Sequence, residues 1–88
     1  MSIKPQLALI TGSARRIGKS LAIALHEKGF NIAIHFNNSQ NEARKLADKL
    51  NSQRNDSAKC FKAELTNQLE LSQMIKNIFD WQNNLAVV

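Results

Sequence analysis

The segment Thr11-Gly12-Ser13-Ala14-Arg15-Arg16-Ile17-Gly18 decides how the rest of the chain is interpreted. It follows a short apolar run, Gln6 to Thr11, which predicts a strand buried on both faces, as in a parallel sheet. After it, apolar residues recur at helical spacing from Arg16 to Lys28, and Gly29 stands where a helix C-cap is expected. The segment is therefore predicted to form the tight turn between a buried strand and an amphipathic helix.

The same alternation of strand and helix continues along the chain. The remaining expected elements are a strand at 31–36, a helix capped by Ser39, a strand at 58–63, a helix capped by Thr66 and a strand at 85–88. Strands that alternate with helices of this length predict an α/β fold with a parallel sheet and right-handed crossovers. We expect a Rossmann-type sheet in the order 3-2-1-4, with the first two helices on one face and the third on the other.

Several single residues carry structural expectations. His26 is expected on the surface of the first helix, and Phe79 on the buried stripe of the third helix. Trp81 is expected to shield that helix and the fourth strand. Cys60 is expected to be a small core residue rather than a nucleophile, since lone strand cysteines are usually buried and inert.

Charge and composition narrow the class of protein. The chain has 88 residues and a net charge of +5, and Arg15, Arg16 and Lys19 gather within or directly after the turn segment. The other basic residues are interspersed with acids, which favours a local phosphate site over a nucleic-acid track. No apolar run approaches the roughly 20 residues of a membrane span. A single cysteine suits a reducing cytoplasm, so we expect a cytoplasmic protein that binds neither nucleic acid nor membrane.

The turn segment has the features of a phosphate-binding loop. A helix amino terminus presents unpaired N–H groups and partial positive charge, which suit a pyrophosphate. Gly12 allows the sharp turn, Gly18 allows helix and strand to approach closely, and Arg15 or Arg16 adds charge-assisted hydrogen bonds. The alternative is an ordinary turn with surface arginines, but the buried strand before it and a second strand about 20 residues later are the context that dinucleotide binding requires. The residues expected at the pyrophosphate are Gly12, Ser13, Ala14, Arg15, Arg16, Ile17 and Gly18.

The end of the second strand bears on the choice of cofactor. Proteins of this fold that use NAD usually place an acid there, which binds the ribose hydroxyls. No acid occurs from Lys28 to Asn41, and amide and hydroxyl groups suit a 2′-phosphate that an acid would repel. The sequence therefore favours NADPH over NADH. The residues expected around the adenosine are His35, Asn37, Asn38, Ser39, Glu64 and Leu65.

These residues also have structural interpretations, which the sequence leaves open. Ser39 with Glu42 forms a capping-box pattern, and this is compatible with a role in binding. His35 is expected to be packed or hydrogen-bonded within its strand, and Glu64 with Leu65 is equally compatible with a plain loop. No Cys/His spacing supports a metal site.

The turn segment, together with Ile34-His35-Phe36-Asn37-Asn38-Ser39, resembles the short-chain dehydrogenase/reductase family, and within it the pteridine reductases. The family loop has Thr-Gly, three variable residues and Gly-x-Gly, and Arg16 stands where the middle glycine would be, as in the pteridine reductases. The resemblance implies that Arg16 reaches the cofactor phosphates or a bound pterin. It also implies that Asn38 and Ser39 bind the 2′-phosphate, and that Glu64-Leu65 replaces an Asp-Leu pair beside the adenine.

The resemblance covers the whole chain but only the amino-terminal part of such an enzyme. The family's catalytic Tyr-x-x-x-Lys motif is absent, because the chain contains no tyrosine. The last apolar run, Leu85 to Val88, stops where the fold would continue, so we expect a sheet truncated after its fourth strand. Residues 1–88 are thus expected to be a partial dinucleotide-binding domain, the NADPH-binding part of a pterin reductase, inactive alone. Complete members are usually homo-oligomers.

Two other classes of function compete with this hypothesis. One is a non-catalytic nucleotide-binding module, or a truncated gene product with no function. The other is a small nucleic-acid binder that uses the charge of +5, which the lack of stacking aromatics and base-reading motifs disfavours. Titration with NADPH and NADH separates these classes.

Overall fold

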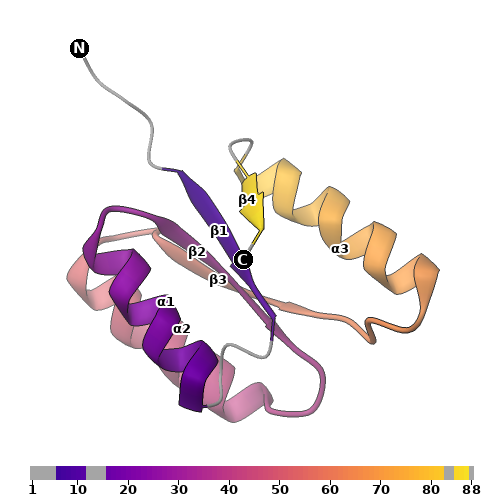
Figure 1. Ribbon diagram of the computed structural model, residues 1–88, viewed down its shortest axis with the longest axis horizontal. Helices are drawn as coiled ribbons and strands as arrows, with labels where there is room; N and C mark the ends of the chain where they lie inside the picture. Colours follow the sequence, from indigo (N-terminus) through magenta and orange to yellow (C-terminus); the bar gives the residue numbers. More distant parts are fainter. Residues whose placement is uncertain (1–5, 12–15, 83–84, 88) are drawn as a thin grey trace.

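The computed structural model describes residues 6–11, 16–82 and 85–87 as a parallel sheet flanked by three helices (Figure 1). In chain order the elements are β1 (Leu7–Ile10), α1 (Arg16–Glu27), β2 (Asn31–Phe36), α2 (Gln40–Gln53), β3 (Ala58–Lys62), α3 (Gln68–Trp81) and β4 (Leu85–Val87). Neighbouring strands pair in the order β3-β2-β1-β4. The predicted α/β fold, with its parallel sheet and three helices, is confirmed.

Strands β1 and β2 form the buried centre of the sheet. Every residue of both strands is buried, including the polar Asn31 and His35 of β2, so both strands are covered on both faces. Ile10 pairs with Ile34, and Phe36 at the end of β2 pairs with Lys62 at the end of β3. The register therefore brings the carboxyl ends of neighbouring strands to one edge of the sheet.

The two faces of the sheet carry separate hydrophobic cores. Successive strand residues point to opposite faces, so Ala8 and Ile34 pack under α1 and α2 while Leu9 and Ala33 pack under α3. Figure 1 shows the same division, with α1 and α2 on one side of the sheet and α3 on the other. The expected placement of the three helices is confirmed.

The carboxyl end of α1 is closed by backbone geometry and by one side chain. Gly29 has a φ of +99°, a left-handed conformation that favours glycine. Its N–H donates to the His26 carbonyl at 3.0 Å, and the Phe30 N–H donates to the Leu25 carbonyl at 3.1 Å, the pair of bonds that defines a Schellman motif. Arg54 adds hydrogen bonds to the carbonyls of His26 and Phe30. The predicted glycine cap is confirmed.

The prediction of a surface position for His26 is wrong. His26 is only 2% exposed, and its Nε2 lies 2.7 Å from the Ser57 Oγ. The buried face of α1 contains Ala22 and His26, while the apolar residues Leu21 and Ala24 are exposed. A helical-periodicity pattern places polar residues outside, and it cannot register a hydrogen-bond partner on a distant segment.

Of the two predicted N-cap residues, one is confirmed and the other is wrong. Ser39 is the N-cap of α2, but its side chain makes no capping hydrogen bond, so the expected capping box is not formed. The N-cap of α3 is Asn67 rather than Thr66: the Asn67 side chain accepts from the N–H groups of Leu69 and Glu70. The Thr66 hydroxyl instead donates to Glu64, a contact that only the folded loop provides.

Helix α3 buries a narrower stripe than its sequence predicts. Met74 and Ile78 are buried, whereas Phe79 is 47% exposed. Trp81 packs against Phe61 of β3, with ring centroids 6.0 Å apart and planes at 50°, and its Nε1 donates to Asp56 at 3.3 Å. Trp81 thus covers the β3 side of the sheet, and its expected contact with the fourth strand concerns side chains outside the described residues.

Candidate dinucleotide-binding site

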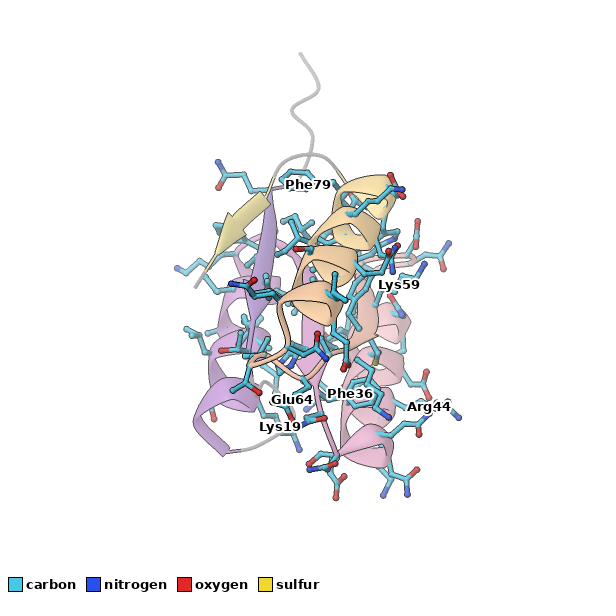
Figure 2. The ribbon with its side chains drawn as sticks, turned by 90° about the vertical axis from the view of Figure 1, so that its right-hand side faces the viewer. Lys19, Phe36, Arg44, Lys59, Glu64 and Phe79 are labelled. Carbon is cyan, nitrogen blue, oxygen red and sulfur yellow. The ribbon has the colours of Figure 1, made fainter. Side chains whose placement is uncertain are left out.

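The candidate site lies at the edge of the sheet where β1, β2 and β3 end. Thr11 follows β1, Asn37 follows β2 and Ala63 follows β3. The backbone N–H of Ala63 donates to the carbonyl of Phe36 at 3.1 Å, which continues the strand pairing into the turns. Figure 2 shows Glu64 and Phe36 near this end of the molecule and Phe79 at the opposite end. Ligands of open parallel α/β sheets bind at this edge.

The phosphate-loop residues are described only in part. Gly12, Ser13, Ala14 and Arg15 lie outside the described residues. The backbone of Arg16, Ile17 and Gly18 forms the first turn of α1, as predicted.

The amino terminus of α1 is described from Arg16 onwards, and a helix amino terminus carries partial positive charge. Its first turn holds no acidic residue, and Lys19 follows directly. The first N–H groups of a helix have no partner within the helix, so this end attracts anions. A pocket of about 200 Å³ beside it is lined by Lys19, Glu42, Lys45, Leu46 and Lys49, and its three ammonium groups outnumber its one carboxylate.

The turn after β2 is tied to the turn after β3 by two side chains. His35 is buried, and its Nε2 lies 2.9 Å from the carbonyl oxygen of Ala63. Since a carbonyl only accepts, that nitrogen carries the proton. The Asn37 Nδ2 donates to the Glu64 Oε2 at 2.8 Å. The structure therefore brings His35, Asn37 and Glu64 together, although Glu64 stands 27 residues beyond Asn37.

The other predicted residues of this region are more open. Asn38 is exposed, Ser39 is half-buried, and Leu65 is 39% exposed. In this position the Ser39 hydroxyl makes no cap bond with α2, so it is not committed to the helix.

Glu64 is an ionised carboxylate. Hydrogen bonds from the Asn37 amide, from the Thr66 hydroxyl and from the Thr66 N–H lower the pKa of Glu64 below its ordinary value. The Oε1 atom accepts from Thr66 Oγ1 at 3.1 Å and from Thr66 N at 3.4 Å. Donors that bind the charged form stabilise it, so this edge of the site is negatively charged at neutral pH.

The contact between Asn37 and Glu64 is the part of the site that sequence reasoning missed. The sequence shows no acid from Lys28 to Asn41, yet the fold places a carboxylate against Asn37. A signal was present: β2 and β3 are neighbours in the predicted sheet order, so their following residues had to meet. The strand order alone did not show which side chains of the two turns would form a hydrogen bond.

Another pocket of the molecule is separate from this site. It has a volume of about 670 Å³, runs along β3 and α3, and contains none of the predicted cofactor-binding residues. Burial raises the pKa of the Cys60 thiol at its wall, which keeps that thiol protonated and poorly nucleophilic. Within the described ranges, no group of His, Cys, Asp and Glu is arranged to hold a metal ion, and no helix has the length and apolarity for a membrane span.

Comparison with known proteins agrees with this architecture. The sequence profile of the short chain dehydrogenases matches residues 6–88. The chain belongs to the short-chain dehydrogenase family. The match includes the whole turn segment.

Three relatives illustrate the range of similar members of the short-chain dehydrogenase family. Pteridine reductase 1 of Leishmania tarentolae is 43% identical over 61 residues, 69% of this chain and 21% of that protein. The uncharacterized oxidoreductase YmfI of Bacillus subtilis is 41% identical over 61 residues, 69% of this chain and 25% of that protein. The 3-oxoacyl-(acyl-carrier-protein) reductase FabG of Staphylococcus aureus is 31% identical over 81 residues, 92% of this chain and 32% of that protein. The aligned part of the chain spans a third or less of each relative.

Proposed function

We propose that residues 1–88 form a partial dinucleotide-binding domain of Rossmann type, the cofactor-binding part of a short-chain reductase. The observation that carries this proposal is the family match over residues 6–88, which includes the loop after β1. In the proposed domain the sheet is doubly wound in the order 3-2-1-4, and the loop meets the cofactor at the centre of the sheet.

The proposed site holds the pyrophosphate at the start of α1. The backbone N–H groups from Gly12 to Gly18 are the proposed donors, and the helix amino terminus adds partial positive charge. The absence of an acid from the first turn of α1 supports this arrangement. Arg16 and Lys19 supply full positive charges at the same end, with Arg16 the stronger candidate because guanidinium groups bind phosphate in a bidentate way.

We propose NADPH as the cofactor, which supplies a hydride to the substrate. Three residues after β2, Asn37, Asn38 and Ser39, offer amide and hydroxyl groups in place of the acid that NAD-dependent members of this fold carry. Leu65 is proposed to lie beside the adenine. His35 is proposed to hold the turn in position through its bond to Ala63.

The substrate proposed for the complete enzyme is a pterin. The relative with 43% identity is a pteridine reductase, and Arg16 matches the loop of that group. The chain contains no tyrosine, so we propose that it binds the cofactor without catalysing reduction. A protein that joins this segment to a Tyr-x-x-x-Lys motif should oxidise NADPH when a dihydropteridine is added. The same protein should be slower with a 3-oxoacyl thioester; a faster reaction with the thioester would overturn the pterin assignment. We also propose a cytoplasmic location and, for the complete enzyme, a homo-oligomer.

Cofactor binding is tested by titrating NADPH into the 88-residue chain and following the fluorescence of the nicotinamide. We expect saturable binding, and we expect Arg16→Ala to weaken it by roughly 5-fold or more, since one charge-assisted phosphate contact is lost. Lys28→Ala is the matched control, because it removes the same charge beyond the far end of α1, where Lys28 is exposed. A folded chain that binds no NADPH contradicts the proposal.

A further inference from the structure

A carboxylate lies at the point where this fold discriminates between NADPH and NADH. Asn37 directly follows β2, the position from which an acid usually binds the adenosine ribose. Its Nδ2 donates to the Glu64 Oε2 at 2.8 Å. One of the two N–H bonds that the Asn37 amide would offer to a 2′-phosphate is therefore committed to an anion.

The position of this carboxylate is determined by bonds on several sides. Its Oε1 accepts from the Thr66 hydroxyl at 3.1 Å, while the Glu64 backbone N–H donates to Glu70 Oε1 at 3.2 Å. The preceding residue, Ala63, is bonded to β2 through the His35 imidazole at 2.9 Å and through the Phe36 carbonyl at 3.1 Å. Glu64 is thus held beside Asn37 by the fold rather than by chance rotation of a surface side chain.

The charge of Glu64 is not cancelled by the groups that hold it. The Asn37 amide and the Thr66 hydroxyl are both neutral donors. Neutral donors stabilise the carboxylate without removing its negative charge. The negative charge of Glu64 repels a phosphate dianion that binds at Asn37. It does not repel a ribose hydroxyl, which is neutral.

We propose that Glu64, acting through Asn37, is a specificity-determining residue that limits the preference for NADPH, so that the chain binds NADPH and NADH with affinities within about tenfold of each other. This inference rests on the proposed function. It assigns Glu64 a role at the ribose end of the cofactor, in addition to any contact with the adenine.

The test measures dissociation constants for both cofactors with the wild-type chain and with Glu64→Gln. Glutamine retains one oxygen, which can accept from Thr66, and its amide N–H can donate to the Asn37 side-chain oxygen once the Asn37 amide is flipped, so the loop is expected to persist while the charge is lost. We expect the preference for NADPH to rise by roughly 3- to 10-fold in Glu64→Gln, a factor that corresponds to one charge interaction across a partly solvated site. The rise should shrink in about 0.5 M salt, because screening weakens exposed charges.

Two further variants test whether the change in cofactor preference depends on the charge at Glu64. Glu64→Asp retains the charge and should keep the preference within about 2-fold of wild type. Asp80→Asn removes an equal charge near the far end of α3, where Asp80 is exposed, and should also leave the preference unchanged. Far-ultraviolet circular dichroism reports whether each variant is folded.

The outcomes separate this inference from the proposed function. A wild-type chain that binds neither cofactor overturns both. Wild-type binding with an unchanged preference in Glu64→Gln overturns only the role of Glu64. An equal rise in Glu64→Asp, or in Asp80→Asn, also overturns that role, because the effect would not follow the charge at Glu64.

Discussion

His26 and Ser57 are joined by a hydrogen bond of 2.7 Å between Nε2 and Oγ, although 31 residues separate them in the chain. Both side chains are buried. The Ser57 hydroxyl lies against the carbonyl oxygens of Leu50 and Arg54 and donates to them, so it accepts from the imidazole N–H. The bond connects the last turn of α1 to the residue that precedes β3.

The unfolding free energy of the chain should fall in mildly acidic solution because of His26. Burial, and next the positive charge of Arg54, lower the pKa of His26 below its ordinary value of 6.5. The unfolded chain therefore protonates this histidine at a higher pH than the folded chain does. The contribution of His26 to the unfolding free energy is complete above the ordinary value and is lost as the pH falls towards the lowered pKa. We expect a loss of about 1 kcal/mol between about pH 8 and pH 5.5 in urea titrations.

The variant His26→Gln provides the comparison. Its stability should change less between the same two pH values, since glutamine does not titrate. His35 is present in both proteins, so the difference between their pH dependences reports His26 alone. An equal pH dependence in the two proteins would remove His26 as its source.

Arg54 should be among the most important polar residues for stability. Its guanidinium donates to the His26 carbonyl at 3.1 Å, to the Phe30 carbonyl at 2.6 Å and to Asn31 Oδ1 at 3.1 Å. Arg54→Met keeps the aliphatic stem but removes these three hydrogen bonds, at an expected cost of about 2 kcal/mol in denaturant unfolding. The exposed Arg44 is the control: Arg44→Met should change stability by less than about 0.5 kcal/mol.

Leucine truncations should distinguish the core from the exposed surface of α3. Leu50 is fully buried and Leu69 is 83% exposed. Leu50→Ala is expected to cost about 2 to 5 kcal/mol, because it removes apolar contacts and leaves a cavity. Leu69→Ala makes the same chemical change and should cost less than about 0.5 kcal/mol. Thermal and urea unfolding measure both, and similar losses would contradict the packing described above.

Truncation of the two helix caps should have unequal effects. The Asn67 side chain accepts from the N–H groups of Leu69 and Glu70 at 3.0 and 3.2 Å, so Asn67→Ala should cost about 1 kcal/mol. Ser39 makes no such side-chain bond, and Ser39→Ala should change the unfolding free energy by less than about 0.5 kcal/mol. A larger loss from Ser39→Ala would show that its hydroxyl caps α2 in solution.

Much of the fold was predictable because its signals are local. The apolar runs around Leu9 and Ile34, the helical spacing that includes Leu46 and Leu50, and the glycine at position 29 each act within one or two turns of chain. The correct predictions are those that depend on such short-range patterns. The error at His26 concerns a remote partner, since Ser57 lies 31 residues away. The error at Thr66 is local, because the neighbouring Asn67 caps α3 while the Thr66 hydroxyl donates to Glu64.

The candidate site likewise has one part that could be predicted from the sequence and one part that could not. That residues 12 to 18 connect a strand to a helix could be read directly, as could the lack of an acid in the turn after β2. The acid that lies next to Asn37 could not be predicted from the sequence, because its position depends on the turn after β3. The assignment of residues 12 to 18 and of Asn37 to cofactor binding is a prediction, which the titrations above test.

The sequence by itself determined the order of strands and helices and the parallel sheet, since hydrophobic period and turn chemistry are written along the chain. Only the tertiary structure decided which polar side chains meet: Glu64 with Asn37, His26 with Ser57, and Arg54 with the end of α1. The physical reason is that a buried polar group must find a hydrogen-bond partner wherever the fold supplies one. That partner is chosen by the packing of whole elements rather than by neighbours in the chain.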